Sequence, residues 1–252
     1  MSFDVAAESY QRFMGRFSEP LAAALVLATD PQRGWKVLDV GCGPGALTGD
    51  LAAWIGDEAV SAVDPSPAFV GAVHRRLPHV DARLGRAEDL PFADATFDAS
   101  YAQLVVHFMH DPVAGLREMR RVTAPGGPVT ACVWDHEGGT GPLAAFWDAV
   151  LDVDPDAPDE SGLAGTREGH LEELFAEAGL HDLEASALTV TVRFESFEQW
   201  WEPFLLGVGP AGAYVAGLDE DALAAVRKSC RARVPARPFF VDATAWCVTG
   251  RV

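Results

Sequence analysis

Short β-branched runs alternate with longer helical stretches between residues 36 and 134, and this alternation limits the possible folds more than any other feature. In the longer stretches apolar residues recur three or four positions apart, which is the period of a helix buried on one side. Strands separated by such helices are typical of a parallel sheet with right-handed crossovers and helices on both faces. The predicted strands are 36–40, 59–63, 80–84, 97–102 and 128–134, and the predicted helices are 46–55, 66–77 and 111–123.

The pattern changes after residue 135, where turn-rich and acidic loops interrupt it. A helical pattern over 196–234 separates two runs that alternate as strands. Two late strands without a regular crossover predict an antiparallel hairpin that completes a seven-stranded sheet. The later predicted elements are a helix between the loops 136–142 and 152–162, a helix over 171–179, and strands over 187–194 and 239–250.

The turn after the first predicted strand is rich in glycine and reads Gly-Cys-Gly-Pro-Gly-Ala over 41–46. Glycine accepts left-handed dihedrals and lets main-chain N–H groups approach a ligand closely. The turn fits the dinucleotide pattern G-x-G-x-x-A, so a nicotinamide dinucleotide and another nucleoside-bearing cofactor both stay open. Asp39, two residues before the first glycine, is a poor neighbour for a pyrophosphate, which binds at helix N–H groups and positive potential. The same carboxylate suits a ligand that carries an ammonium group and a positive sulfur.

Acidic residues also follow the second and third predicted strands. Ligands of open α/β sheets bind beyond the carboxyl ends of the strands. Asp64 ends the second strand and is placed to accept hydrogen bonds from ribose hydroxyls, or alternatively to cap the turn before Pro65. After the third strand, the main chain of Ala87 and the carboxylate of Glu88 are candidates to bind an adenine amine. The alternative for Glu88 is an exposed loop acid.

The segments VLDVGCGPGALT, AVDPSPAFV, GRAEDLPF and LREMRRVTAPGG resemble the successive motifs of class I S-adenosylmethionine-dependent methyltransferases, in the small-molecule, type 11-like branch. The resemblance covers about residues 33–134, and 8–18 is similar to the segment that covers the cofactor in many members. It implies an α/β, Rossmann-like, seven-stranded, mostly parallel sheet of order 3-2-1-4-5-7-6. The last strand is then antiparallel, and a helical insertion precedes it.

Position by position, the resemblance also implies a set of cofactor contacts. Arg86 departs from the family, because Asp or Asn is common before Ala-Glu. The implied contacts are Gly41 and Gly43 at the methionine end, Asp64 with Pro65 at the ribose, Ala87 and Glu88 at the adenine, and Gln103 facing the methionine moiety.

We expect one methyltransferase domain over residues 1–252, whose segments have different roles. The expected segments are N-terminal cofactor-covering helices over 1–32, a cofactor-binding core over 33–135, a variable substrate-side region with the sixth strand over 136–195, a helical insertion or lid over 196–238, and the last strand over 239–252.

Three further residues are candidates, one on the substrate side and two over the cofactor. His107 follows the fourth strand and is our candidate general base, because an imidazole pKa of about 6.5 suits proton removal. The alternative is a partly buried loop histidine. Tyr10 and Arg16 are predicted to close over the cofactor, with the Arg16 guanidinium on the methionine carboxylate. The alternative is that this N-terminal helix simply packs through Phe13 and Phe17.

The predicted function is transfer of a methyl group from S-adenosylmethionine to a small-molecule acceptor by in-line displacement, with S-adenosylhomocysteine as product. Positioning is the largest expected contribution, about 7–11 kcal/mol, so no catalytic triad is required. A binding protein without turnover is one alternative, and an NAD-dependent oxidoreductase, for which no Tyr-x-x-x-Lys motif is found, is another. The insertion aromatics predict either an apolar acceptor pocket or a lid core; they are Trp200, Trp201, Phe204 and Tyr214.

Composition narrows the partners and the compartment. A formal net charge of −18 repels phosphate backbones and anionic lipid, so we expect neither nucleic acid nor membrane as a partner. Four well-separated cysteines without a CxxC pair predict no metal site and no disulfide framework, which fits a reducing cytoplasm. Abundant alanine with few lysines suggests a GC-rich, bacterial genome, and the oligomeric state stays open.

Overall fold

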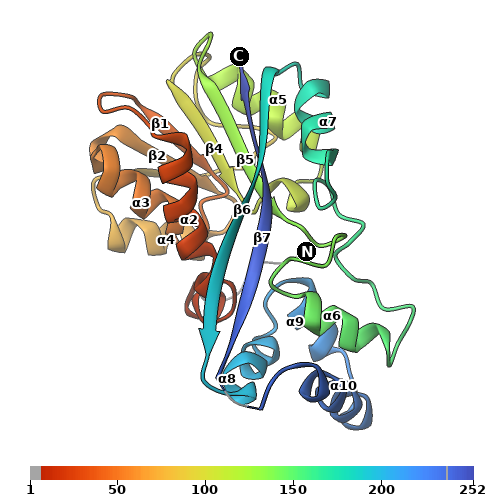
Figure 1. Ribbon diagram of the computed structural model, residues 1–252. Coiled ribbons are helices and arrows are strands. Elements are labelled where there is room, and N and C mark those ends of the chain that lie inside the picture. Colours follow the sequence, from red (N-terminus) through yellow and green to blue (C-terminus); the bar gives the residue numbers. More distant parts are fainter. Residues whose placement is uncertain (1–6, 237) are drawn as a thin grey trace.

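The computed structural model describes residues 7–236 and 238–252, and its centre is one seven-stranded sheet of order β3-β2-β1-β4-β5-β7-β6 (Figure 1). Neighbouring strands from β3 to β5 pair in parallel, whereas β7 pairs antiparallel with both β5 and β6. This confirms the predicted fold class and strand order. The strands are β1 (Val37–Val40), β2 (Val60–Asp64), β3 (Asp81–Leu84), β4 (Ala99–Gln103), β5 (Pro128–Trp134), β6 (His181–Phe194) and β7 (Phe239–Arg251).

Helices cover both faces of the sheet, as the alternation predicts. On β1, Val37 joins the apolar cluster formed with one set of helices, while Leu38 joins the cluster on the opposite face. Successive side chains of a strand point to opposite faces, so a buried parallel strand supplies both cores. One face carries α2 (Arg16–Thr29), α3 (Ala46–Ile55) and α4 (Pro67–Arg76), and the other carries α5 (Pro112–Val122) and α7 (His170–Glu177).

Local capping explains where two of these helices begin. Ser66 accepts a hydrogen bond from the Phe69 N–H, and Asp111 accepts one from the Ala114 N–H. A proline follows each cap at the first helical position, where its missing N–H costs nothing. The predicted helices therefore begin within a residue or two of the observed ones.

Strand β6 is longer than the sequence pattern predicts, because it begins at His181 and not at residue 187. Most side chains over 181–189 are exposed, so this edge strand shows no alternation of buried and exposed positions there. The pairing with β7 also shifts register between His181 and Glu184, and Asp182 adopts a left-handed φ of 51°. A β-bulge of this kind is common at sheet edges.

A helical lobe hangs below the sheet in Figure 1, and we define it as α6 (Ala144–Leu151), α8 (Phe197–Trp201), α9 (Gly209–Ala216) and α10 (Glu220–Arg233). The last three helices lie between β6 and β7, as the predicted insertion requires. Trp200, Trp201 and Phe204 are buried against one another, so they form the core of the lobe. The Tyr214 hydroxyl donates to Asp154 Oδ2 at 3.1 Å. The sequence predicts that these aromatic residues form either an acceptor pocket or the core of the helical insertion, and their mutual packing supports the second.

The N-terminal segment joins the lobe to the sheet. It consists of α1 (Ala7–Tyr10) and a π-helical turn, Gln11–Gly15, that runs directly into α2. The Phe13 ring packs on Phe204, with centroids 5.1 Å apart, and Tyr10 packs on Phe69 of α4 at 5.5 Å. This segment therefore closes the space between α4 and the lobe.

Within residues 7–236 and 238–252, no helix has the length and apolar character needed to cross a bilayer. The four cysteines are free and buried. A search of the same residues finds no group of three or more His, Cys, Asp or Glu side chains that would hold a metal ion.

Candidate active site

A cavity of ≈ 1050 Å³ lies beyond the carboxyl ends of the parallel strands. Residues that directly follow β1, β2, β3 and β4 line it, which is where open α/β sheets bind ligands. Its volume is at the upper end of the range of about 300–1000 Å³ that is usual for small-molecule sites. The predicted residues that line it are Tyr10, Gly41, Gly43, Asp64, Pro65, Ala87, Glu88, Gln103 and His107.

Two glycines of the turn after β1 are required for different reasons. Gly41 has a φ of +68°, and a Cβ there would lie 2.2 Å from Val105 Cγ2. Gly43 has a φ of +52°, but a Cβ there would meet no atom within 4 Å. The first glycine therefore permits close packing against the β4 side, whereas the second leaves an open approach from the cavity.

Asp64 connects the first two loops. Its Oδ2 accepts the Gly43 N–H at 2.9 Å, and its Oδ1 accepts the Ser66 N–H at 2.8 Å. Burial raises the pKa of Asp64, and these two hydrogen bonds oppose that shift. The residue thus has the turn role given above as its alternative, and it also lines the cavity.

Glu88 is not a free loop acid. Its Oε1 accepts the His110 N–H at 2.7 Å, and the Asp111 N–H lies 3.4 Å from the same oxygen. The carboxylate therefore ties the loop after β3 to the start of α5, while it lines the cavity beside the buried Ala87.

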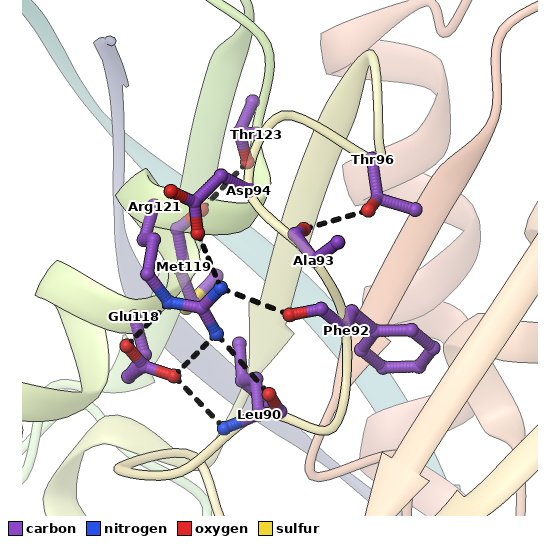
Figure 2. A network of polar contacts seen from close by, with 9 residues as sticks. All are labelled: Leu90, Phe92, Ala93, Asp94, Thr96, Glu118, Met119, Arg121 and Thr123. Atoms are coloured by element: carbon purple, nitrogen blue, oxygen red, sulfur yellow. Dashed lines mark hydrogen bonds and ion pairs between the residues drawn. The ribbon is translucent and has the colours of Figure 1, made fainter.

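Arg121 of α5 holds the rest of that loop in place, as Figure 2 shows. Its Nη1 donates to the carbonyl oxygen of Phe92 at 2.9 Å and to Asp94 at 2.8 Å. Its Nη2 donates to the carbonyl oxygen of Leu90 at 3.1 Å, and Glu118 Oε2 accepts the Leu90 N–H at 3.0 Å. The hydrogen bonds that Arg121 donates to Glu118, and next those to Asp94, raise the pKa of its guanidinium. The loop is therefore fixed by a charged side chain that the sequence pattern placed only on a helix.

Gln103 and His107 stand at the β4 end of the cavity. The Gln103 amide donates from Nε2 to the Ser18 carbonyl oxygen at 2.9 Å, and its buried Oε1 has no hydrogen-bond partner. His107 is 5% exposed, and its buried Nδ1 also has no partner. Burial, followed by the neighbouring His136, holds the pKa of His107 well below its usual range. The ring is therefore a neutral imidazole, in a more buried position than the loop alternative assumed.

Comparison with known proteins agrees with this geometry. The family model described as "Methyltransferase domain" matches residues 38–131. Those residues carry the turn after β1, Asp64, Ala87, Glu88, Gln103 and His107. Residues 38–131 form a class I methyltransferase domain.

Three relatives show how far the likeness extends. An uncharacterized methyltransferase of Mycobacterium bovis is 37% identical over 135 residues, which is 54% of this chain and 52% of that protein. A demethylmenaquinone methyltransferase of Corynebacterium kroppenstedtii is 39% identical over 104 residues, or 41% of this chain and 43% of that protein. The chain thus spans about half the length of these curated relatives.

The third relative is a solved structure, the phosphoethanolamine N-methyltransferase 2 of Haemonchus contortus in complex with phosphomonomethylethanolamine and S-adenosylhomocysteine. It superposes with a TM-score of 0.60 at 16% identity, covering 99% of this chain and 58% of that chain. At this identity the likeness concerns the fold, and the fold extends beyond the methyltransferase domain into the helical lobe.

The two N-terminal candidates, Tyr10 and Arg16, differ in where the structure places them. Tyr10 lines the cavity, and burial, followed by the charge of Asp64, raises the pKa of its hydroxyl. Arg16 instead donates from Nη1 to the Gln199 carbonyl oxygen at 3.2 Å, and its guanidinium lies 5.4 Å from the Phe194 ring centroid. It therefore ties α2 to β6 and α8, and the expectation that it reaches the methionine carboxylate is not met by this placement.

Asp39 also differs from the sequence interpretation. It is 1% exposed, and its Oδ2 accepts the Thr48 hydroxyl at 2.6 Å. Burial raises the pKa of Asp39 to about 7. The carboxyl thus supports α3 and does not line the cavity. Asp39 can therefore influence a ligand only indirectly, through the position of the glycine turn.

Sequence reasoning missed several cavity residues. Val105, two residues after Gln103, occupies the space that a side chain at Gly41 would need. Arg86 lines the cavity although it was noted only as a departure from the family. Gly162, Leu163 and Ala164 come from the loop between α6 and α7. No pattern in that loop marks these three residues, because only the packing of the lobe brings them to the cavity.

Proposed function

We propose that the protein transfers a methyl group from S-adenosylmethionine to a small-molecule acceptor and releases S-adenosylhomocysteine. One observation carries the proposal. Groups that follow four parallel strands line one cavity within a methyltransferase domain. The names of relatives support the same class of reaction, since they include a demethylmenaquinone methyltransferase and a phosphoethanolamine N-methyltransferase.

The side chains of the cavity fit such a donor. The orphan Gln103 Oε1 is a buried acceptor that an ammonium group would satisfy, and the open face of Gly43 leaves room for close approach of the methionine end. In this proposal Gly41 and Gly43 line that end. The remaining proposed contacts are Asp64 and Pro65 at the ribose, Ala87 and Glu88 at the adenine, and Tyr10 over the cofactor.

When bound, the donor supplies an electrophilic methyl group on a positive sulfur. The protein's part is then to hold the acceptor at near-attack distance, which contributes up to about 7–11 kcal/mol. His107 is proposed as the catalytic residue that takes the acceptor proton, an effect of about 10²–10⁴ in rate. Its burial keeps the ring neutral and able to accept that proton. Because the pKa of His107 is low, the imidazole takes up the acceptor proton only while the bond between the acceptor and the methyl group forms.

The roles of the chain segments are part of the same proposal. The cofactor-binding core is 33–135, and two segments, 1–32 and 196–238, close over it. The region 136–195 supplies the sixth strand and part of the substrate side, and the last strand is 239–252. We also propose a cytoplasmic, bacterial protein that does not bind nucleic acid or membrane. The charge of −18 and four free, buried cysteines support this.

The test combines binding with turnover. Calorimetry should detect binding of S-adenosylhomocysteine and no binding of NAD. A labelled methyl donor should transfer its label to at least one member of an acceptor panel. Binding of NAD in place of S-adenosylhomocysteine would favour an oxidoreductase. Binding without transfer to any acceptor would favour the cofactor-binding protein without turnover. His107→Ala should lower the turnover of acceptors that lose a proton and leave S-adenosylhomocysteine affinity unchanged.

A further inference from the structure

A second, small chamber of ≈ 30 Å³ lies behind His107. It shares the lining residues Tyr10, Leu104, His107 and Phe108 with the large cavity, so the two spaces adjoin at these residues. We infer, on the basis of the proposed function, that this chamber receives the reacting end of an uncharged, apolar acceptor that bears a hydroxyl group, such as a phenol.

The walls of the chamber are apolar and come from parts of the chain outside the cofactor loops. Phe13 and Met14 belong to the π-helical turn, Trp134 ends β5, and Val208–Ala211 form the start of α9. None of the described residues that line the chamber is Lys or Arg. A phosphate or carboxylate inside it would thus lose its hydration without meeting a positive side chain, which is strongly unfavourable.

Burial also shifts the pKa of each of four ionisable residues of the chamber toward its uncharged form. Burial lowers the pKa of His136 to about 4 and raises that of Glu160 to about 7. Glu160 Oε2 accepts the Trp147 indole N–H at 2.9 Å. Burial likewise lowers the pKa of His107 and raises that of Tyr10. An ammonium group would therefore find only a weakly ionised carboxyl, so the chamber favours a neutral group over either charge.

Two buried polar atoms point to a hydroxyl in particular. His107 Nδ1 and Trp134 Nε1 have no hydrogen-bond partner, and both residues line the chamber. The indole N–H can only donate, whereas a neutral imidazole can accept, and a hydroxyl both accepts and donates. A volume of ≈ 30 Å³ suits the hydroxyl-bearing end alone, so the body of the acceptor occupies part of the large cavity.

The step balances with these groups. The acceptor oxygen forms a bond to the methyl carbon, the carbon–sulfur bond breaks with its electron pair going to sulfur, and the hydroxyl proton passes to His107. No further reactant is needed.

The experiment uses three acceptors that share a 4-ethylphenyl body and differ in the reacting end: 4-ethylphenol, the anion 4-ethylbenzoate and the cation 4-ethylbenzylammonium. With S-adenosylmethionine, kcat/KM should be at least tenfold higher for 4-ethylphenol than for either charged acceptor. Preference for the anion or the cation would overturn the inference. Calorimetry with S-adenosylhomocysteine distinguishes failure of this inference from failure of the proposed function. Binding of that product without methylation of 4-ethylphenol overturns this inference alone, whereas no binding overturns the proposed function as well.

A charge introduced into the chamber gives a second, independent readout. Met14 is half-buried, so Met14→Lys can place an ammonium group at the wall, and Met14→Leu is the matched control. Met14→Lys should shift the kcat/KM ratio at least tenfold toward 4-ethylbenzoate, whose reacting end is the carboxylate, and Met14→Leu should leave it within twofold. An unchanged ratio in a folded Met14→Lys protein would show that the acceptor does not enter this chamber.

Discussion

The large cavity and the small chamber meet at His107, yet they are built in different ways. Glycines and acidic residues at consecutive strand ends line the first, and the pairing register of the sheet sets their positions. Aromatic and aliphatic side chains from distant segments, such as Phe13, Trp134 and Pro210, form the second. A site of the first kind is specified locally, whereas a site of the second kind exists only once the tertiary packing is complete.

The largest expected effect tests the locally specified side. Gly41→Ala combines a left-handed φ of +68° with a Cβ 2.2 Å from Val105, so we expect a loss of about 2–5 kcal/mol in unfolding free energy and loss of S-adenosylhomocysteine binding. Gly43→Ala is the control, because its Cβ meets open space and only strain of about 1–2 kcal/mol remains. Urea denaturation and calorimetry measure both effects. Equal losses of stability in the two variants would contradict the packing argument.

The next prediction concerns the pH dependence of the unfolding free energy, and it compares a buried carboxyl beside the large cavity with one in the small chamber. The pKa of Asp39 rises from 3.8, and that of Glu160 from 4.5, each to about 7 in the folded protein. The folded state therefore binds these protons more tightly than the unfolded state, so both groups make the unfolding free energy fall as pH rises from about 4 to 7. Asp39→Asn and Glu160→Gln should each remove about 2–3 kcal/mol of that fall. Denaturation midpoints across pH measure it, and variant curves parallel to the wild type would refute it.

A smaller effect is expected where a side chain supports the cofactor side from α5. Arg121→Met removes the contacts of Figure 2 to Phe92, Asp94 and Glu118, so we expect a loss of about 1–2 kcal/mol of stability and weaker S-adenosylhomocysteine binding. The apparent affinity for 4-ethylphenol should change less than that for S-adenosylhomocysteine. A larger loss on the acceptor side would mean that the two sites are not separately supported.

The smallest effect sets the baseline. Glu173 of α7 pairs with Arg167, which precedes that helix; neither residue lines the cavity or the chamber, and their side chains are 60% and 43% exposed. Glu173→Gln should change the unfolding free energy by less than about 0.5 kcal/mol, because water screens such pairs. A larger shift in urea denaturation would mean that the surface contributes as much as the two sites.

The fold and the cofactor side follow from sequence because both depend on short-range signals. Ser66 and Asp111 mark helix starts, and the glycine turn and Asp64 mark strand ends, so the sheet edge could be located in advance. The direction of the Asp39 side chain could not be predicted. All four β1 residues are buried, so no alternation of buried and exposed positions shows which face of the sheet Asp39 points to. Arg16 was misplaced because its partner, Gln199, lies 183 residues away. The chamber behind His107 shares that property, and no local pattern marks its walls.

The last pair of strands has a consequence for how such a protein diversifies. Pairing of β7 with β5 begins at Ala245, so Phe239–Ala243 pairs only with β6 and extends as a two-stranded ribbon for about 17 Å (Figure 1). Phe194 and Phe239 stack at its tip, with ring centroids 5.5 Å apart, and α8 to α10 begin and end there. The intervening segment takes no part in the pairing of the parallel strands, so a segment of another length can join these two rings without changing that register.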